Sequence, residues 1–252
     1  MSDSIIEALA ILHVAHFTEK PTLIFLHDSL GCIELWRDFP EKLAQACNCN
    51  YLVYDRQGYG KSCGFGDEKR TLNYLEHEAD LLAELIEKQQ IKQAILFGHS
   101  DGGSIALLTA ALHPKNIAGI VTEGAHVLVE EVTLKGIRAA MHQYQTTDLK
   151  SRLEKYHGKN TQALFDAWTL TWTSEMFRDW NIEYCLPQIQ CPALIIQGQD
   201  DEFGTLDQVE RITRQMALAQ KLILPKTGHN PHKESPDEVI EHTRNFILKI
   251  IK

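Results

Sequence analysis

The sequence predicts an α/β fold, in which a mostly parallel sheet carries helices on both faces. Short, almost continuously apolar runs alternate along the chain with segments whose apolar residues recur every three or four positions. Runs of the first kind are typical of parallel strands covered on both sides, and the second spacing gives a helix one apolar face. Because strands and helices alternate, we expect right-handed crossovers and hence a parallel sheet.

Six apolar runs are the predicted parallel strands. Each is rich in leucine, isoleucine, valine or aromatic residues and is followed by turn-forming residues. They are Thr22–His27, Tyr51–Tyr54, Ala94–Phe97, Ile117–Thr122, Ala193–Gln197 and Lys221–Leu224. An earlier apolar stretch, from Ala8 to Phe17, is preceded by Asp3 and Glu7 where a signal peptide has basic residues, and it is too short for a membrane span. We interpret it as an opening strand.

Two segments show the clearest helical spacing. One apolar stripe runs from Leu72 to Ile86 and a second from Val239 to Ile250. Each of these stripes predicts an amphipathic helix packed on the sheet.

Residues 125–190 interrupt the alternation, because no convincing strand lies between Gly124 and Cys191. Apolar residues at helical spacing and three of the four tryptophans fall here, so we expect helices that cover the sheet. The predicted organisation is an α/β core of residues 1–124 and 191–252, with a helical cap of residues 125–190. The aromatic residues of the cap either dock it onto the core or line a substrate pocket. Our predicted pocket walls are Trp168, Trp172 and Phe177.

Composition limits the class of protein. Of 252 residues, 44% are hydrophobic and 23% charged, which is ordinary for a globular chain and unlike a disordered one. The net charge is −9 and no long basic cluster occurs, so nucleic acid is not an expected partner. Six cysteines without metal-binding spacing suit reduced thiols. We expect a cytoplasmic protein that acts on a small molecule, without nucleic-acid or membrane partners; the oligomeric state is left open.

A G-x-S-x-G motif carries the strongest chemical signal. It consists of Gly98, Ser100 and Gly102, between an apolar strand and an alanine- and leucine-rich helix. A strand-to-helix turn this tight forces the serine into strained backbone geometry, exposes its hydroxyl above the sheet and places it near the helix N-terminus. The pattern predicts a nucleophilic serine; the alternative is a turn serine that caps the helix.

A serine nucleophile needs a base, and the base needs an orienting acid. Asp200 and Asp201 follow the predicted strand at Ala193–Gln197, and His229 follows the one at Lys221–Leu224. The carboxyl ends of parallel strands are where catalytic groups gather in open α/β sheets. We therefore predict His229 as the base, with either aspartate as the acid. His232 is its only close competitor, and a zinc site at this histidine pair lacks a nearby third ligand.

Together these motifs resemble the α/β-hydrolase superfamily, in the branch with a helical cap. The matching segments run from about Thr22 to the C-terminus and include FLHDSLG, DRQGYGKS, GHSDGG, GQDDEFG and TGH. The resemblance implies Ser100 as nucleophile, His229 as base and Asp201 as acid, with Asp200 as the alternative. It also implies an oxyanion hole made by the backbone N–H groups of Ser29 and Asp101.

Two departures from the family pattern concern charge. Asp28 replaces the usual glycine after His27, and Asp101 directly follows the nucleophile. A carboxylate near an oxyanion opposes the developing charge, so each must point away, be neutralised by a partner such as Arg56, or meet a cation on the substrate. A further possibility is that Asp101 caps the helix. Some similar Ser-Asp-Gly-Gly proteins hydrolyse esters that carry an amino group.

The sequence therefore predicts a serine hydrolase that cleaves a small carboxylic ester through an acyl-enzyme, with no metal or organic cofactor. Cleavage of a carbon–carbon bond, an enol-lactone or a thioester, and elimination of pyruvate, are alternatives with the same residues. A non-catalytic binding protein on the same fold is another.

Overall fold

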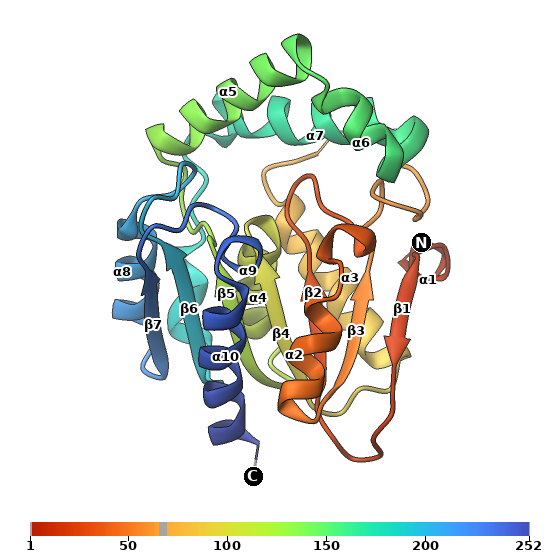
Figure 1. Cartoon of the computed structure of the whole chain (residues 1–252), viewed down its shortest axis with the longest axis vertical. Coiled ribbons are helices and arrows are strands. Elements are labelled where there is room, and N and C mark those ends of the chain that lie inside the picture. Colours follow the sequence, from red (N-terminus) through yellow and green to blue (C-terminus); the bar gives the residue numbers. More distant parts are fainter. Residues whose placement is uncertain (1, 66–69, 252) are drawn as a thin grey trace.

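The computed structural model describes residues 2–65 and 70–251 and contains a seven-stranded sheet in the order β1-β3-β2-β4-β5-β6-β7. Figure 1 shows this sheet at the centre of the molecule, with helices in front and behind. All neighbouring pairs are parallel except β1 with β3. The predicted α/β fold is confirmed.

The strands have the following bounds: β1 Ile11–Val14, β2 Thr22–Leu26, β3 Asn50–Tyr54, β4 Ala94–His99, β5 Ile117–Glu123, β6 Ala193–Gly198 and β7 Ala219–Leu224. The helices are α1 Ser2–Glu7, α2 Phe39–Cys47, α3 Tyr74–Lys88, α4 Asp101–Leu112, α5 Glu131–Thr146, α6 Leu149–His157, α7 Thr161–Trp172, α8 Leu206–Gln215, α9 Pro231–Glu234 and α10 Pro236–Ile250. Short 3₁₀ turns occupy Ile33–Trp36, Gly158–Asn160, Glu175–Phe177 and Glu183–Gln188.

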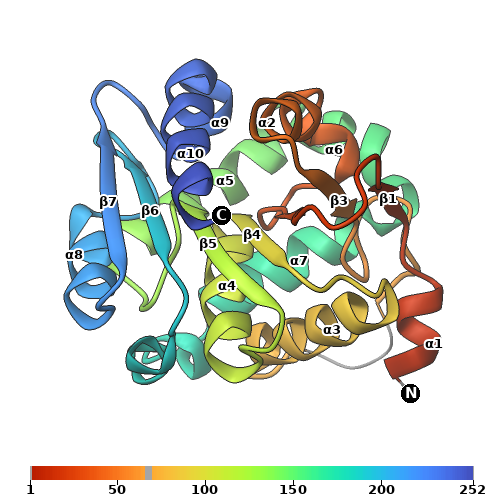
Figure 2. The same ribbon diagram turned by 90° about the horizontal axis from the view of Figure 1, so that it is seen from below.

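Helices cover both faces of the sheet, as the view along it shows (Figure 2). On one face α2 and α10 pack through Leu43, Phe39 and Phe246 against Phe25 and Phe97 of the sheet. On the other face α3, α4 and α8 bury a larger apolar cluster. Burial on both faces explains why β2 and β4 are apolar at almost every position and are fully buried.

The first strand is shorter than expected. It spans Ile11–Val14 within the predicted stretch, and it pairs antiparallel at one edge of the sheet. Its four residues are all partly or fully exposed. An edge strand covered on one side only needs fewer apolar positions, which is why its boundaries are blurred in the sequence.

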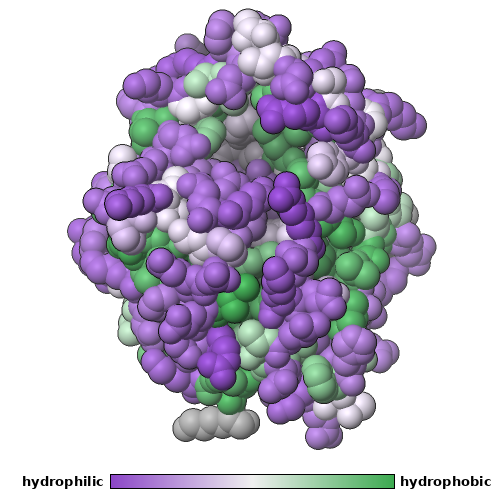
Figure 3. Space-filling model, in the orientation of Figure 1, coloured by the Kyte–Doolittle hydropathy of each residue, from purple (hydrophilic) through white to green (hydrophobic). Residues whose placement is uncertain are grey.

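In the sequence, helices α5, α6 and α7 come between β5 and β6. In space, they cross over the carboxyl ends of the strands (Figure 1). The surface is hollowed between these helices and the sheet (Figure 3). Among residues 2–65 and 70–251, no helix has both the length and the apolar character of a membrane span.

Candidate active site

Ser100 occupies the sharp turn between β4 and α4. Its backbone has φ +55° and ψ −119°, a conformation that costs energy for any residue with a side chain. The flanking glycines make the turn possible: a Cβ at Gly98 would lie 2.1 Å from the Gly102 carbonyl oxygen, and one at Gly102 would lie 2.0 Å from the Leu26 carbonyl oxygen. The G-x-S-x-G spacing is therefore a steric requirement of this turn.

The Ser100 hydroxyl meets His229. Ser100 Oγ lies 3.0 Å from His229 Nε2, although 129 residues separate them in sequence. His229 follows β7, whose carboxyl end lies at the same edge of the sheet as that of β4. The two side chains are buried, with residue exposures of 8% and 6%. The distance suits transfer of the hydroxyl proton to the imidazole.

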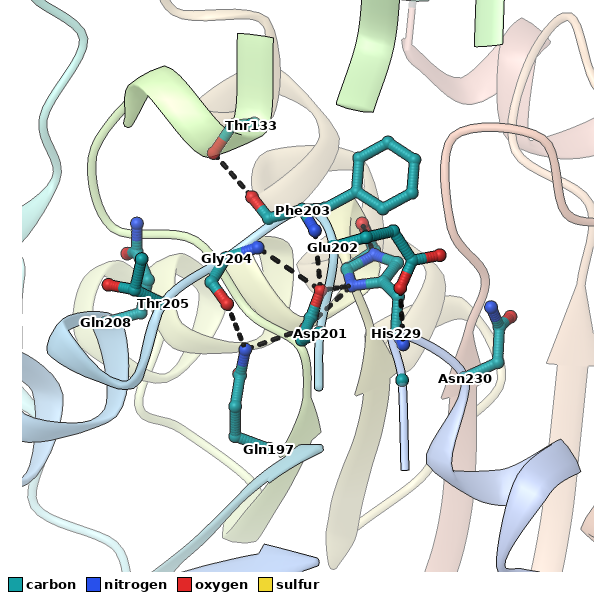
Figure 4. A network of polar contacts seen from close by, with 12 residues as sticks. Thr133, Gln197, Asp201, Glu202, Phe203, Gly204, Thr205, Gln208, His229 and Asn230 are labelled. Atoms are coloured by element: carbon teal, nitrogen blue, oxygen red, sulfur yellow. Dashed lines mark hydrogen bonds and ion pairs between the residues drawn. The ribbon is translucent and has the colours of Figure 1, made fainter. Parts of the chain in front are cut away.

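Asp201, rather than Asp200, lies against the other nitrogen of His229. Both carboxylate oxygens of Asp201 are 2.9 Å from Nδ1. Figure 4 shows how the β6–α8 loop wraps this carboxylate. It accepts hydrogen bonds from Gln197 Nε2 at 2.7 Å and from the backbone of Phe203 at 2.8 Å. Asp200 is exposed, and only its backbone is held, by Thr227.

The pairing changes the proton affinity of both groups. Burial by itself would lower the pKa of His229, but the hydrogen bond and charge of Asp201 raise it above its usual value. Burial would raise the pKa of Asp201, yet His229 and the Phe203 amide hold it below its usual value. Asp201 therefore stays ionised and favours a protonated His229, which is the charge state that forms when a base accepts a proton.

Further groups fix the backbone of His229. His99 Nε2 lies 2.7 Å from the His229 carbonyl oxygen and donates to it, and the His229 amide donates to Glu202 at 3.2 Å. Gly124, at φ +56°, passes beneath the ring, where a Cβ would lie 2.9 Å from His229 Nδ1. The position of His229 is therefore fixed by hydrogen bonds to its backbone and by the close packing of Gly124 against its ring.

The predicted oxyanion donors lie at the same cavity. Ser29 and Asp101 line it together with Ser100 and His229. Within the described residues, neither backbone N–H has a recorded hydrogen-bond acceptor. Both are available to a ligand oxygen, and that of Asp101 is also at the start of α4, where the helix dipole favours negative charge.

The loop that carries Ser29 is fixed by Arg56. The Arg56 backbone N–H donates to His27 Nε2 at 3.1 Å, and its guanidinium donates to the Asp28 carbonyl at 2.9 Å. A Cβ at Gly31 would lie 2.2 Å from Asp28 Oδ1, so the loop is tightly closed. The HDSLG and DRQGYG segments thus form one unit.

Of the two unusual carboxylates, Asp101 has a specific partner. Its side chain accepts a hydrogen bond from the Tyr74 hydroxyl at 3.2 Å, and Oδ2 lies 3.8 Å from Arg56. Ser100 makes no side-chain capping bond at the start of α4, and no backbone amide of the described residues donates to the Asp101 carboxylate. Asp101 is therefore placed beside a cation rather than used as a helix cap.

A cavity of about 220 Å³ opens above Ser100. Its walls combine the site residues with apolar side chains from α5, α6 and α7, including Ile137, Leu149, Trp168 and Trp172. The prediction that Phe177 is a pocket wall is wrong, because Phe177 does not line this cavity. Its side chain is fully buried, with its ring 5.0 Å from Trp172 and stacked 5.2 Å from Trp180, so it packs beneath the pocket wall.

Several residues of the site escape sequence reasoning. Gln197 and His99 bond Asp201 and the His229 backbone, Phe203 and His126 line the cavity, and Tyr74 donates to Asp101. A signal exists only for those in or next to motifs, since Gln197 directly precedes GQDDEFG, Phe203 lies within it and His99 lies within GHSDGG. Among the described residues, no group of three or more histidine, cysteine or acidic side chains is arranged to hold a metal.

Known proteins resemble this chain over most of its length. The sequence model of the alpha/beta hydrolase family matches residues 23–242. The serine hydrolase BPHL of Homo sapiens is 28% identical over 208 residues, which cover 78% of this chain and 68% of that protein.

Two further relatives differ in the reaction that their names describe. A 2-hydroxy-6-oxononadienedioate/2-hydroxy-6-oxononatrienedioate hydrolase of Burkholderia vietnamiensis is 26% identical, over 84% of this chain and 82% of its own. A 2-succinyl-6-hydroxy-2,4-cyclohexadiene-1-carboxylate synthase of Enterobacter is 25% identical, over 87% and 88%. Among solved structures, the alpha/beta hydrolase MGS-M2, from a deep-sea metagenome library, superimposes with a TM-score of 0.79 at 19% identity, covering 97% of this chain and 95% of its own.

Proposed function

The chain belongs to the alpha/beta hydrolase family, and on this basis we propose that it is a serine hydrolase that cleaves a small carboxylic ester through an acyl-enzyme. The observation that carries the proposal is the contact series Ser100–His229–Asp201, with distances of 3.0 and 2.9 Å, at the floor of a cavity. A serine that only caps the helix does not require a buried histidine and aspartate arranged in series with its hydroxyl.

In the proposed first step, Ser100 Oγ attacks the ester carbonyl while His229 Nε2 takes the hydroxyl proton. Asp201 keeps the Nδ1 proton in place and stabilises the imidazolium that forms. The backbone N–H groups of Ser29 and Asp101 bind the oxyanion, and such donors are typically worth about 3 kcal/mol each in transition-state stabilisation. His229 then gives its proton to the leaving alcohol, and Ser100 is acylated.

In the second step water attacks the acyl-enzyme. His229 removes a proton from the water, the same two N–H groups hold the second oxyanion, and the proton passes to Ser100 as the carboxylic acid leaves. The step needs only water beyond the groups already present, so the proposal invokes no cofactor.

A second candidate is cleavage of a carbon–carbon bond, favoured by the relative from Burkholderia vietnamiensis. The loop from His27 to Gly31 bears on this alternative. It has no glycine until Gly31 and carries Asp28, whose pKa stays low despite burial because the positive charge of Lys233 is close. An ionised carboxylate at the cavity wall repels the anionic dienoates that such a hydrolase takes as substrates. This observation ranks ester cleavage first.

Activity on a panel of para-nitrophenyl esters, thioesters, lactones and ring-fission dienoates tests the proposal. We expect turnover of short-chain esters by the wild type and its loss, by at least a thousandfold, in Ser100→Ala, because the oxyanion hole and binding alone remain. Ser151→Ala is the matched control, since Ser151 is an exposed serine of α6 outside the cavity, whose hydroxyl donates to the Asp148 carbonyl at the start of its own helix. Turnover of dienoates alone would favour the second candidate.

Labelling by a fluorophosphonate separates an enzyme from a binding protein on this fold. We expect covalent labelling of Ser100 and none in Ser100→Ala. An unlabelled wild type would contradict the proposal, because a serine paired with His229 in this way is activated toward such a reagent.

A further inference from the structure

His126 lies on the wall of the cavity and takes no part in the chemistry proposed above. It follows β5 and its exposed fraction is 3%. Its backbone is locked on both sides by Ser104, whose hydroxyl donates to the His126 carbonyl at 2.6 Å and accepts from the His126 amide at 3.2 Å. A buried serine thus holds this histidine in a fixed position.

The ring of His126 is enclosed between aromatic groups. It packs edge-on against Trp172, with centroids 5.3 Å apart, and its centroid is 5.9 Å from that of His229. Burial, and then the charge of His229, lower the pKa of His126 to about 4. The imidazole is therefore neutral near pH 7, with one N–H donor and one bare nitrogen.

Neither ring nitrogen has a hydrogen-bond partner among the described residues. Nδ1 is fully enclosed and without a partner; the side of the ring that carries it lies next to Gly204, where a Cβ would be 3.6 Å from Nδ1. An enclosed N–H without an acceptor costs about 1–3 kcal/mol, so the proton is better placed on Nε2. The ring then presents an Nε2–H donor toward the cavity.

The other walls decide which acceptor suits this donor. Asp28 and Asp101 line the same cavity, and Asp201 lies behind His229. These carboxylates disfavour an anionic group, so the acceptor has to be uncharged. Ether, hydroxyl, amide and keto oxygens all meet that requirement.

We propose that His126 is a specificity-determining residue, whose Nε2–H binds an uncharged oxygen of the substrate beyond the scissile carbonyl. The inference rests on the proposed function and adds the substrate class to it: esters with a second, neutral oxygen function. A site that holds a buried donor rejects an analogue without the acceptor, because the donor is then left unpaired.

Isosteric esters test the proposal. The probes are para-nitrophenyl hexanoate and three analogues in which an ether oxygen replaces the third, fourth or fifth acyl carbon. We expect the wild type to prefer at least one ether ester over hexanoate by about tenfold in kcat/KM. His126→Phe should lose that preference while it still cleaves hexanoate, and His126→Asn, which keeps an N–H donor, should retain part of it. His142→Phe, at an exposed position of α5 outside the cavity, is the matched control and should behave as the wild type.

A second readout does not depend on turnover. Ser100→Ala with ¹⁵N-labelled histidine should show a shift of the His126 ring nitrogen signals when the preferred ether ester is added, and none with hexanoate. A wild type that cleaves hexanoate without preferring any ether ester would overturn the role of His126 and leave the hydrolase intact. Unshifted His126 signals in the presence of bound ether ester would also overturn it. Inertness toward every ester, combined with a His126 shift, would instead contradict the proposed reaction.

Discussion

The carboxylate of Asp101, the residue directly after Ser100, lies 3.8 Å from the guanidinium of the fully buried Arg56. Glu78 approaches the same guanidinium at 3.9 Å, and Arg70 lies over the Tyr74 ring at 4.4 Å. Two acidic and two basic side chains therefore lie close together beneath Ser100. A buried carboxylate beside the proposed oxyanion hole is tolerable because Arg56 lies next to it.

The same cluster connects α7 to α3 and to the start of α4. Trp172 Nε1 of α7 donates to the Tyr74 hydroxyl at 2.9 Å, and Tyr74 donates in turn to Asp101. The pocket wall and the residue after the nucleophile are thus linked through one tyrosine. The position of α7 and the orientation of the Asp101 carboxylate are not independent.

Asp201 and Asp200 differ sharply in their predicted importance. Asp201→Asn should lower kcat by a hundredfold or more, since it removes the charge that stabilises the His229 imidazolium, whereas Asp200→Asn should stay within about twofold of the wild type. Steady-state kinetics on one ester compare the two. A larger loss of kcat in Asp200→Asn would show that Asp200, and not Asp201, is the acid.

The pH dependence should follow His229. Because its neutral form is the base and Asp201 raises its pKa, kcat/KM should fall on acidification with an inflection above the usual histidine value of about 6.5. In Asp201→Asn, burial is left without its main opposing contribution, so the inflection should move to lower pH. Profiles of kcat/KM measured for both proteins check the sign. An unchanged inflection in the variant would argue against direct coupling.

The sequence predicts the parts of this molecule that depend on local rules. The positions of the strands and the G-x-S-x-G turn follow from burial and backbone sterics, which leave a pattern within a few residues. The choice between Asp200 and Asp201 does not follow from such rules. It depends on Gln197 and the Phe203 amide, which turn only one of two adjacent carboxylates toward His229.

The pocket lies further beyond sequence reasoning, because helices pack by shape rather than by motif. Trp168 and Phe177 have the same apolar character in the sequence, and only the packing of α7 and of the turn Glu175–Phe177 separates a wall residue from one beneath the wall. His126 has no motif at all. Its role rests on the absence of a hydrogen-bond partner within the described residues, which is a property of the folded chain.

The cap residues should separate into two classes on mutation. Trp168→Ala should change KM or acyl-chain preference, because it removes an indole from the cavity wall. Phe177→Ala should leave the preference unchanged and lower stability by about 3–5 kcal/mol, as expected for a fully buried aromatic. Chain-length profiles and thermal unfolding measure the two effects. An altered preference in Phe177→Ala with normal stability would return this residue to the pocket.

The carboxylate of Asp101 bears on which substrate charge the site prefers. Its Oδ2 is occupied by Tyr74 and faces Arg56, whereas Oδ1 has no recorded partner among the described residues and the side chain borders the cavity. Asp28 adds a second carboxylate to the same wall. We predict that an ester with an ammonium group on its acyl part is preferred over its neutral isostere, since an ion pair in a partly dehydrated site is stronger than in water.

Asp101→Asn is the informative change because it keeps the shape and the backbone N–H while it removes the charge. The variant should lose most of the preference for the cation, by roughly tenfold in kcat/KM or about 1.4 kcal/mol, with the neutral ester much less affected. Asp28→Asn, measured at the same ionic strength, shows how much of the effect is due to the second carboxylate. Equal rates of the wild type on the two esters would mean that Arg56 already neutralises Asp101 fully. Asp101 would then serve the site through its backbone alone, and its side chain would be retained for the bond that Tyr74 donates to it.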